Sequence, residues 1–326
     1  MFLTILLLLS GFILLIKGAD WFVDNASSFA FRFGIPAHII GMTVVAFGTS
    51  APELSVSITA ALRGSSGIAI GNVVGSCLIN LLLVGGISAA MRPLPINKSI
   101  LFKNYPYSIV GAIVLLILSY DSFFETGKNF LSRGDGAILL IFFLIFLYFT
   151  VSETKQNLRE EKQEKAEWKE SLELKKPNPV KNTILLLLGL VGVVGGGQLI
   201  VTQAVSIASA AGISEGLIGL TVVAIGTSLP ESVTSVIAVK KGNSDIALSN
   251  IIGSNIYNIF LILGLSAFIT AIPVDVDSVF DTFILCVTSM LFYIPMFFAK
   301  KVSRPVGILM IVTYLVYLSY LIFSRL

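Results

Sequence analysis

The chain has 326 residues, of which 55% are hydrophobic and only 13% are charged, and its mean hydropathy is +0.91. A soluble domain carries roughly a quarter charged residues, so this composition excludes an ordinary soluble protein and predicts a membrane protein. With a formal net charge of only +3, we expect the lipid bilayer as its surroundings, no nucleic-acid partner and no protein partner.

Apolar segments of about 20 residues, the length that crosses a hydrocarbon core roughly 30 Å thick, recur along the whole chain. These segments must be helices, because an open sheet would leave backbone groups unpaired in lipid. The second and third segments of each half are interrupted by Gly, Ser, Thr and Pro. The expected spans are about 2–30, 38–61, 67–90, 105–120, 135–152, 182–209, 217–239, 246–271, 280–299 and 305–323. The sequence therefore predicts an all-α membrane protein with ten transmembrane helices.

One block of sequence occurs twice. GMTVVAFGTSAPE begins at Gly41, and GLTVVAIGTSLPE begins at Gly219, 178 residues later. The match continues without a gap to Asn97 and Asp275, with about 25 identities in 57 positions. Each half holds five spans, and because five is odd, the second half enters the membrane from the opposite face. We expect two inverted five-helix repeats, 1–152 and 182–326, joined by a charged linker at 153–181, which is the architecture of secondary transporters.

The distribution of lysine and arginine predicts the orientation. With both termini outside, 17 of the 22 Lys and Arg residues fall on the inward side and four on the outward side. Cytoplasmic loops carry such an excess of positive charge. We therefore expect a multi-pass protein of the cell membrane, with both termini outside and the 153–181 loop in the cytoplasm.

Glu53 and Glu231 are the only acidic residues deep inside the predicted spans, and they occupy equivalent positions of the two blocks. A carboxylate near the bilayer centre costs at least roughly 2.5 kcal/mol, so each is a candidate for function. Inverted repeats would bring the two together near the midplane. A pair of protonated glutamates, hydrogen-bonded between helices, is the purely structural alternative.

Each glutamate follows a motif that breaks a helix, Gly-Thr-Ser-X-Pro. Pro52 and Pro230 cannot donate a backbone hydrogen bond, and their rings clash with the carbonyl four residues back, so each helix must kink or unwind. This frees carbonyls around residues 46–49 and 224–227, which lipid forbids unless they meet a positive charge. Side-chain oxygens accompany these carbonyls in the breaks and one helix later, from Thr49, Ser50, Thr227, Ser228, Ser76, Asn80, Ser254 and Asn258.

These candidate ligands are all oxygens, which suit hard cations, and a pair of carboxylates suits Ca²⁺ better than Mg²⁺, which dehydrates reluctantly. Part of the Ser, Thr and Gly content is also explained by close packing of helices in membranes, the role we assign to Gly75 and Gly253. Cys77 is expected to pack as a small residue, and the lone His38 is expected to be an interfacial residue without chemistry.

The two blocks resemble the α-repeats of the sodium/calcium exchangers of the Ca²⁺/cation antiporter superfamily. The resemblance rests on the GTS-x-PE core and the downstream GS-x3-N, and the short linker is similar to that of the prokaryotic members. It implies a secondary active transporter that exchanges Na⁺ for Ca²⁺ by alternating access and electrogenically. It also implies no enzymatic activity and no cofactor, with Ca²⁺ and Na⁺ as the transported ions.

The resemblance further implies where the ions bind. Ca²⁺ would lie between Glu53 and Glu231, with the carbonyls of Thr49 and Thr227. The flanking Na⁺ sites would use both glutamates, the carbonyls of Ala46 and Ala224, and the hydroxyls of Ser50, Ser76, Ser228 and Ser254. Asn80 and Asn258 would complete the centre.

The chain departs from some members of the family at Asn258, where potassium-dependent exchangers and certain archaeal ones carry Asp. With Asn at both central positions the site has a formal charge of −2, which favours exchange that does not need K⁺. Three other functions stay open from the residues alone. They are a proton/calcium antiporter that uses the same glutamates, a cation channel, and an intramembrane enzyme with a carboxylate acid–base pair.

Overall fold

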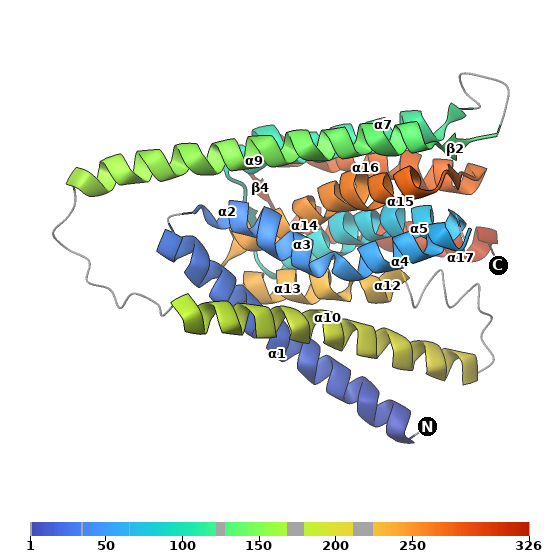
Figure 1. Ribbon diagram of the computed structural model, residues 1–326, viewed down its shortest axis with the longest axis horizontal. Coiled ribbons are helices and arrows are strands. Elements are labelled where there is room, and N and C mark those ends of the chain that lie inside the picture. Colours follow the sequence, from blue (N-terminus) through green and yellow to red (C-terminus); the bar gives the residue numbers. More distant parts are fainter. Residues whose placement is uncertain are drawn as a thin grey trace.

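The computed structural model describes residues 2–33, 35–64, 66–121, 128–167, 179–210 and 224–325. These residues are almost entirely helical, and most helices run roughly parallel to the long axis of the molecule (Figure 1). Eight helical segments among them are long and apolar enough to cross a membrane, and a bent pair, 37–49 with 51–62, makes a ninth. The first part of the expected span at 217–239 lies outside the described residues. The all-α membrane fold is confirmed, and the count of ten spans stays a prediction.

The first half contains long outer helices and two segments that change helix type along their length. The outer helices are α1 (Phe2–Phe33), α7 (Tyr105–Ser119) and α9 (Arg133–Glu167). The other segments are α2 (Ala37–Ile40), η1 (Gly41–Val45), α3 (Ala46–Thr49) and α4 (Ala51–Leu62), then α5 (Ser66–Leu78), η2 (Ile79–Val84) and α6 (Gly85–Met91), with η3 (Ile100–Asn104) before α7. The η elements are π-helical.

The second half repeats this order. Its elements are α10 (Pro179–Ala210), α12 (Ala224–Thr227), α13 (Leu229–Lys240), α14 (Ser244–Ile256), η5 (Tyr257–Leu263), α15 (Gly264–Ile269), α16 (Val276–Ala299) and α17 (Arg304–Arg325). A π-helical segment thus follows α5 in one half and α14 in the other, at equivalent positions. The equivalence extends the sequence repeat to the backbone.

Helix α9 is longer than the sequence suggested. The predicted span ends at residue 152, but α9 continues to Glu167 into the segment assigned to the linker. That segment is rich in Glu, Lys and Gln, which all have high helix propensity. The boundary expected at 152 therefore falls inside a helix.

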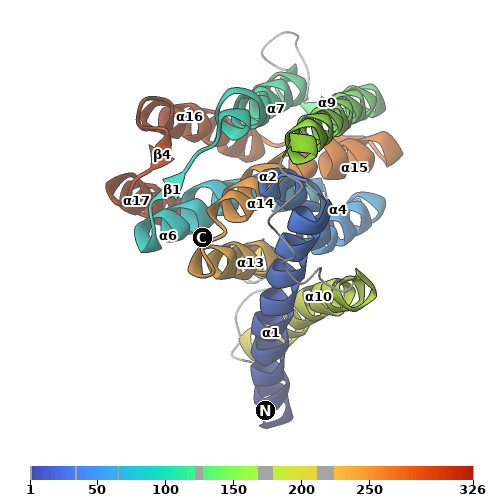
Figure 2. The ribbon, with the colours of Figure 1, turned by 90° about the vertical axis from the view of Figure 1, so that its left-hand side faces the viewer.

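Two central segments form the core. In the spans 68–91 and 244–269, 78% and 83% of the residues of an 18-residue apolar stretch are buried, whereas the share is 17–39% in the other single-helix spans. In Figure 2, α14 lies in the middle of the bundle, with α16, α17, α7, α9 and α4 around it. The repeat blocks thus contribute the most enclosed helices, and the peripheral helices present apolar side chains outward, as lipid requires.

Four short strands reveal how the halves are related. β1 (Leu94–Pro95) pairs with β4 (Lys301–Val302), and β2 (Phe130–Leu131) pairs with β3 (Ile272–Pro273). β1 and β3 are equivalent, since 272 − 94 is 178, yet the two strand pairs lie toward opposite ends of the bundle (Figure 1). Equivalent elements at opposite ends are what inverted repeats require, and this prediction is confirmed.

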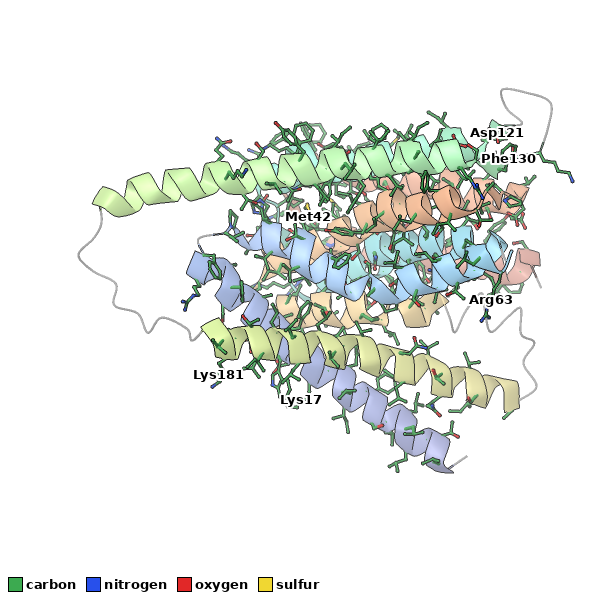
Figure 3. All side chains as sticks on the ribbon, viewed as in Figure 1. Lys17, Met42, Arg63, Asp121, Phe130 and Lys181 are labelled. Atoms are coloured by element: carbon green, nitrogen blue, oxygen red, sulfur yellow. The ribbon has the colours of Figure 1, made fainter. Side chains whose placement is uncertain are left out.

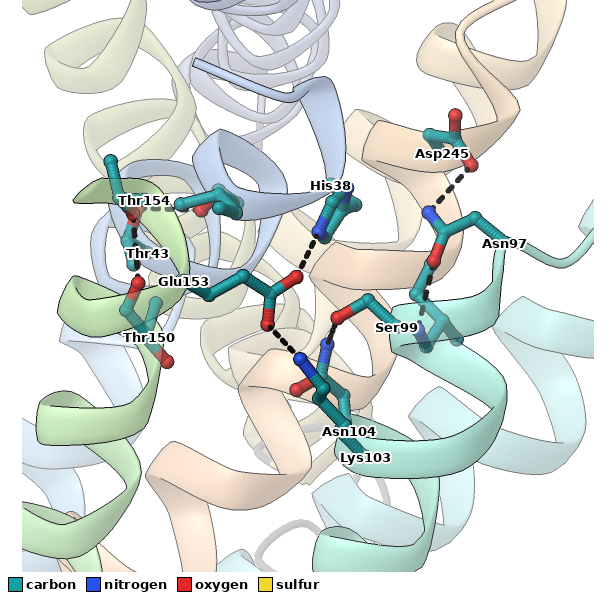
Figure 4. A network of polar contacts seen from close by, with 12 residues as sticks. His38, Thr43, Asn97, Ser99, Lys103, Asn104, Thr150, Glu153, Thr154 and Asp245 are labelled. Atoms are coloured by element: carbon teal, nitrogen blue, oxygen red, sulfur yellow. Dashed lines mark hydrogen bonds and ion pairs between the residues drawn. The ribbon is translucent and has the colours of Figure 1, made fainter. Parts of the chain in front are cut away.

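Polar contacts also tie helix ends together. His38 Nε2 lies 3.1 Å from Glu153 Oε1, and Lys103 Nζ lies 3.3 Å from Glu153 Oε2, so one carboxylate links α2, η3 and α9 (Figure 4). Asn97 Nδ2 donates to Asp245 Oδ1 at 3.2 Å, which joins the two halves. His38 is therefore more than the inert interfacial residue we expected, because α9 brings the carboxylate of Glu153 to it.

A second ion pair holds α1. Lys241 Nζ lies 2.6 Å from Asp20 Oδ1 and 2.7 Å from Asp24 Oδ1. Both aspartates fall within the first predicted span, but their side chains are 43% and 59% exposed. They therefore differ from Glu53 and Glu231, which are fully buried.

Helices α1 and α10 pack closely through glycines and lie along one side of the bundle (Figures 1 and 2). A Cβ added at Gly18 would lie 2.6 Å from the Val193 nitrogen, and one added at Gly196 would lie 2.5 Å from the Leu15 nitrogen. Such distances are too short for any side chain. Small residues let helix backbones approach closely in membranes, where packing supplies much of the association energy.

We predict that Gly196→Ala lowers the melting temperature of the purified protein by several degrees, because its methyl group must push the backbones of α1 and α10 apart. Overpacking of this kind costs typically 1–3 kcal/mol. The neighbouring Gly195→Ala is the matched control, since its Cβ would meet only Leu14 Cδ2, at 4.0 Å. Equal melting temperatures for the two variants would contradict the close contact.

Candidate cation site

The two repeated helices break at equivalent serines. Ser50 (φ −82°, ψ 7°) separates α3 from α4, and Ser228 (φ −86°, ψ 3°) separates α12 from α13. Pro52 and Pro230 follow in the first turn of the new helix, a position where the missing N–H is tolerated. The axes on the two sides of Ser50 differ by 47°. The predicted break is therefore a bend at one residue.

The sequence had suggested more extensive unwinding around residues 46–49. The Ser50 amide still donates to the Ala46 carbonyl at 3.0 Å, and the Leu54 amide donates to the Ser50 carbonyl at 3.1 Å. The Ala46 carbonyl also lies 3.3 Å from the Thr49 hydroxyl, whose single proton can instead go to the Val45 carbonyl or to Asn250 Oδ1, and a lone pair of Ala46 is then free for a cation. Ala46 is buried, and the described backbone of the equivalent Ala224 begins α12.

Both carboxylates are fully buried, and each is contacted by the broken helix of the other repeat. The Ser50 hydroxyl donates to Glu231 Oε1 at 2.9 Å, and Ser228 Oγ lies 3.4 Å from Glu53 Oε1. Ser76 reaches the same Glu53 oxygen at 3.5 Å and accepts from Ser228 at 2.9 Å. The structure thus brings both helix breaks and both glutamates into one centre.

Several side-chain oxygens of the predicted site residues have no hydrogen-bond partner among the described residues. They are Glu53 Oε2, Glu231 Oε2, Ser254 Oγ, Asn80 Oδ1 and Asn258 Oδ1, all fully buried. An unpaired buried polar group costs several kcal/mol in an apolar environment, and a buried charge costs more. A cation coordinated by these oxygens would satisfy the whole set at once.

The donor set fits Ca²⁺ and Na⁺ better than a transition metal. The described residues contain no group of three or more His, Cys, Asp or Glu that could hold a metal ion. Two carboxylates and several neutral oxygens remain, which is the ligand chemistry of hard cations. Cys77 and Cys286 are buried and free, as a packing role requires.

Asn80 and Asn258 lie at a change of helix type that the sequence did not reveal. Each is the second residue of a π-helical segment, η2 in the first half and η5 in the second. Single π-helical turns often occur at functional sites, because they displace backbone groups from the regular pattern. The same irregularity occurs at equivalent positions, and both carboxamides are fully buried.

Two further polar residues of this region were missed by the sequence analysis. Asn72 accepts from the Thr227 hydroxyl at 3.1 Å, and Asn250 accepts from the Thr49 hydroxyl at 3.2 Å. A signal for them exists, since Asn72 and Asn250 are an identical pair in the alignment of the two blocks. The expected threonine ligands therefore have their side chains engaged by asparagines.

The halves also meet on the axis that relates them. Cys77 and Asn255 are equivalent positions, 178 residues apart, and the Asn255 side chain donates to the Cys77 carbonyl at 3.2 Å. Residues related by a two-fold axis touch only where the axis passes between them. The axis therefore runs between α5 and α14, one helical turn before Asn80 and Asn258.

Comparison with known proteins agrees with this architecture. The family described as "Sodium/calcium exchanger protein" matches residues 3–152 and 181–323. The putative antiporter CaxA of Alkalimonas amylolytica is 36% identical, over 99% of this chain and 100% of its own length. The sodium/calcium exchanger MaX1 of Methanosarcina acetivorans is 32% identical, over 98% of each chain. A solved structure of the sodium-calcium exchanger NCX_Mj superimposes with a TM-score of 0.83, at 34% identity and 98% coverage of both chains.

The family match covers nearly the whole chain, and the similar solved structure shares the inverted helical architecture described above. The buried glutamates, the broken helices and the two asparagines all belong to the matched segments. The chain therefore belongs to the sodium/calcium exchanger family.

Proposed function

We propose that the chain is a secondary active transporter that exchanges Na⁺ for Ca²⁺ across the cell membrane by alternating access. The observation that carries the proposal is the set of buried side-chain oxygens that have no hydrogen-bond partner among the described residues, including one oxygen of Glu53 and one of Glu231. These oxygens come from both inverted halves, whose junction is where secondary transporters bind their substrates. The membership of the family and the similarity to MaX1 and NCX_Mj support the same ions.

The ligands follow from the geometry and the family resemblance together. Ca²⁺ binds to the carboxylates of Glu53 and Glu231 and to the carbonyls of Thr49 and Thr227. Na⁺ uses the two glutamates with the neutral oxygens on either side, and Asn80 and Asn258 complete the centre. The neutral oxygens for Na⁺ are the carbonyls of Ala46 and Ala224 and the hydroxyls of Ser50, Ser76, Ser228 and Ser254.

The charge of the centre explains the exchange. Two carboxylates give −2, which one Ca²⁺ or two Na⁺ neutralise. A third Na⁺ leaves a net charge of +1, so an exchange of three Na⁺ for one Ca²⁺ is electrogenic. Moving one charge through the membrane potential is worth about 2.3 kcal/mol per 100 mV. The sodium gradient and the potential together then drive Ca²⁺ against its own gradient.

The moving elements in this proposal are α1 and α10. They pack on each other through glycines, and they lie at one side of the bundle, beside the broken helices (Figure 1). A smooth glycine-lined contact lets the pair slide as one body over a fixed site. The ion pair between Lys241 and the two aspartates of α1 is one of the contacts that such a movement alters.

The orientation follows from the positive charges, with both termini outside and the 153–181 loop in the cytoplasm. Arg63 was predicted to face outward and Lys181 inward, and the two residues lie at opposite ends of the bundle (Figure 3). The first repeat, 1–152, and the second, 182–326, then cross the membrane in opposite directions.

We predict that Glu53→Gln and Glu231→Gln each abolish ⁴⁵Ca²⁺ uptake into proteoliposomes loaded with Na⁺. Each change keeps the shape of the side chain but removes one of the two charges that balance Ca²⁺. The melting temperature should stay the same or rise, since a neutral amide is less costly to bury than a carboxylate. Asp277→Asn, at an exposed carboxylate, is the control. Near-normal uptake by both glutamine variants would sink the proposed site.

The same vesicles separate Na⁺ coupling from H⁺ coupling. We expect no uptake when a pH gradient is imposed without Na⁺. Uptake driven by the pH gradient alone would instead identify a proton/calcium antiporter. A channel would be identified by Ca²⁺ flux that needs no counter-ion and far exceeds roughly a thousand ions per second. That rate lies at the top of the usual range of turnover rates.

For the orientation, we predict that an impermeant thiol reagent labels Lys128→Cys and Asp277→Cys in intact cells but labels Lys301→Cys only after permeabilisation. All three positions are exposed, whereas the native Cys77 and Cys286 are buried and give little background. Labelling of Lys301→Cys from outside would reverse the assigned orientation.

We further predict that transport needs no K⁺, because Asn258 supplies a neutral oxygen where an aspartate would add a charge. The Asn258→Asp variant should be slower, and its activity should depend more steeply on pH, since a centre of −3 holds cations longer or takes up a proton. The measurement is Na⁺-driven ⁴⁵Ca²⁺ uptake with K⁺ present or absent. A wild-type protein that is silent until K⁺ is added would contradict the argument.

A further inference from the structure

Two buried asparagines near the site have no part in the function proposed above. Asn72 lies on α5 and is 5% exposed, and Asn250 lies on α14 and is 0% exposed. They occupy equivalent positions, 178 residues apart. The side-chain atoms of Asn80 and Asn258 have no hydrogen-bond partner among the described residues, whereas both polar side-chain atoms of Asn72 and of Asn250 are hydrogen-bonded to protein groups. Their role therefore differs from that of a ligand.

The hydrogen bonds of Asn72 join three places in the chain. Its Nδ2 donates to the Ser57 hydroxyl at 2.9 Å and to the main-chain carbonyl of Glu53 at 3.4 Å. Its Oδ1 accepts from the Thr227 hydroxyl at 3.1 Å. Ser57 and Glu53 belong to α4, whereas Thr227 belongs to the other repeat.

Asn250 makes the equivalent set of bonds in the second half. Its Nδ2 donates to the Ser235 hydroxyl at 2.9 Å and to the main-chain carbonyl of Glu231 at 3.4 Å. Its Oδ1 lies 3.2 Å from the Thr49 hydroxyl, whose single proton it shares as an acceptor with the Val45 carbonyl at 3.1 Å and the Ala46 carbonyl at 3.3 Å. Each of the three bonds has its counterpart in the other half, within 0.1 Å. Because the contact occurs at both equivalent positions, it belongs to the repeat architecture and not to one local environment.

Each asparagine thus connects a glutamate of its own repeat with the threonine of the opposite repeat. Asn72 holds Glu53 and Thr227, and Asn250 holds Glu231 and Thr49. Together they contact all four of the residues to which the proposed function assigns Ca²⁺. A carboxamide offers two donors and two acceptor lone pairs, so three of its four bonding positions are used in each case.

We propose that Asn72 and Asn250 are positioning residues that hold the two helix breaks against each other and thereby set the affinity for Ca²⁺. The proposal rests on the ligand assignment given under the proposed function. Ca²⁺ affinity depends on the rigidity of the site, and Ca²⁺ must contact both breaks at once. The two threonines belong to the Ca²⁺ set and not to the Na⁺ set, so loosening them affects Ca²⁺ more strongly than Na⁺.

The test measures the Ca²⁺ and Na⁺ concentrations for half-maximal exchange of Asn72→Ala and Asn250→Ala in proteoliposomes. Loss of groups that orient metal ligands typically lowers metal affinity by 10–100-fold. We expect the half-maximal Ca²⁺ concentration to rise at least about tenfold in each variant. The half-maximal Na⁺ concentration should change several times less. Unchanged Ca²⁺ values, or equal changes for both ions, overturn the proposal.

Double variants distinguish positioning from a general structural effect. Thr227→Val removes the hydroxyl that Asn72 accepts from but leaves the carbonyl in place. Asn72→Ala and Thr227→Val should therefore be non-additive, whereas Asn72→Ala and Thr49→Val, which are not partners, should multiply their effects. For Asn250→Ala the partner change is Thr49→Val, so these two should be non-additive, whereas Asn250→Ala and Thr227→Val should multiply their effects. Additive effects in both partner pairs overturn the proposal, and the valine variants test it if an alanine variant does not fold.

A binding measurement separates this inference from the transport function. Stabilisation of the purified protein by Ca²⁺, read as the rise in melting temperature with Ca²⁺ concentration, requires no exchange. If wild-type vesicles show no Na⁺-driven uptake, the proposed function fails. The asparagines are then still judged by whether their variants need about tenfold more Ca²⁺ for the same stabilisation. Wild-type Ca²⁺ dependence in both variants overturns the positioning role.

Discussion

Two carboxylates buried inside a protein that lipid surrounds are the constraint on which the rest of the structure depends. An uncompensated charge is very costly at this depth, so every nearby feature supplies either a hydrogen bond or an oxygen that shares a cation. Ser50 donates to the carboxylate of Glu231, Ser228 lies beside the carboxylate of Glu53, and each repeated helix bends at its serine. A cation bound between the carboxylates would offset this cost, as the proposed function requires.

The inverted repeat makes this constraint symmetric. Equivalent residues touch across the axis, as Cys77 and Asn255 do, and equivalent strands pair toward opposite ends of the bundle. Each helix break is stabilised by a serine and an asparagine of the opposite half. The two halves have similar folds and opposite directions. The site therefore has similar surroundings on the side of each half. A structure of this kind is suited to presenting the same ligands to the two sides of a membrane.

The symmetry is broken in detail at the centre. Ser76 and Ser228 bond to each other on one side, whereas the equivalent Ser254 hydroxyl has no partner among the described residues. The two flanks of the site therefore differ in the conformation described here. Alternating access requires such a difference, since two identical flanks would open and close together.

Much of this arrangement could be predicted from the sequence. The duplicated block identified Glu53 and Glu231, and the helix-breaking prolines indicated where the helices bend. These signals are local, because proline acts on its own turn and a buried charge is visible in an apolar run. An odd number of spans per half was enough to predict the inversion, since it depends only on counting crossings.

The tertiary structure alone decided which side chains meet. Nothing in the sequence indicated that Asn72 would bond to Thr227, or that η2 and η5 would be π-helical at the two central asparagines. Both depend on the packing of one half against the other, and the pairing of residues 155 positions apart leaves no local pattern. The sequence by itself determined the chemistry of the site, because residue types and spacing carry it. Its geometry was decided by the fold, because hydrogen bonds between the halves exist only once both halves are packed.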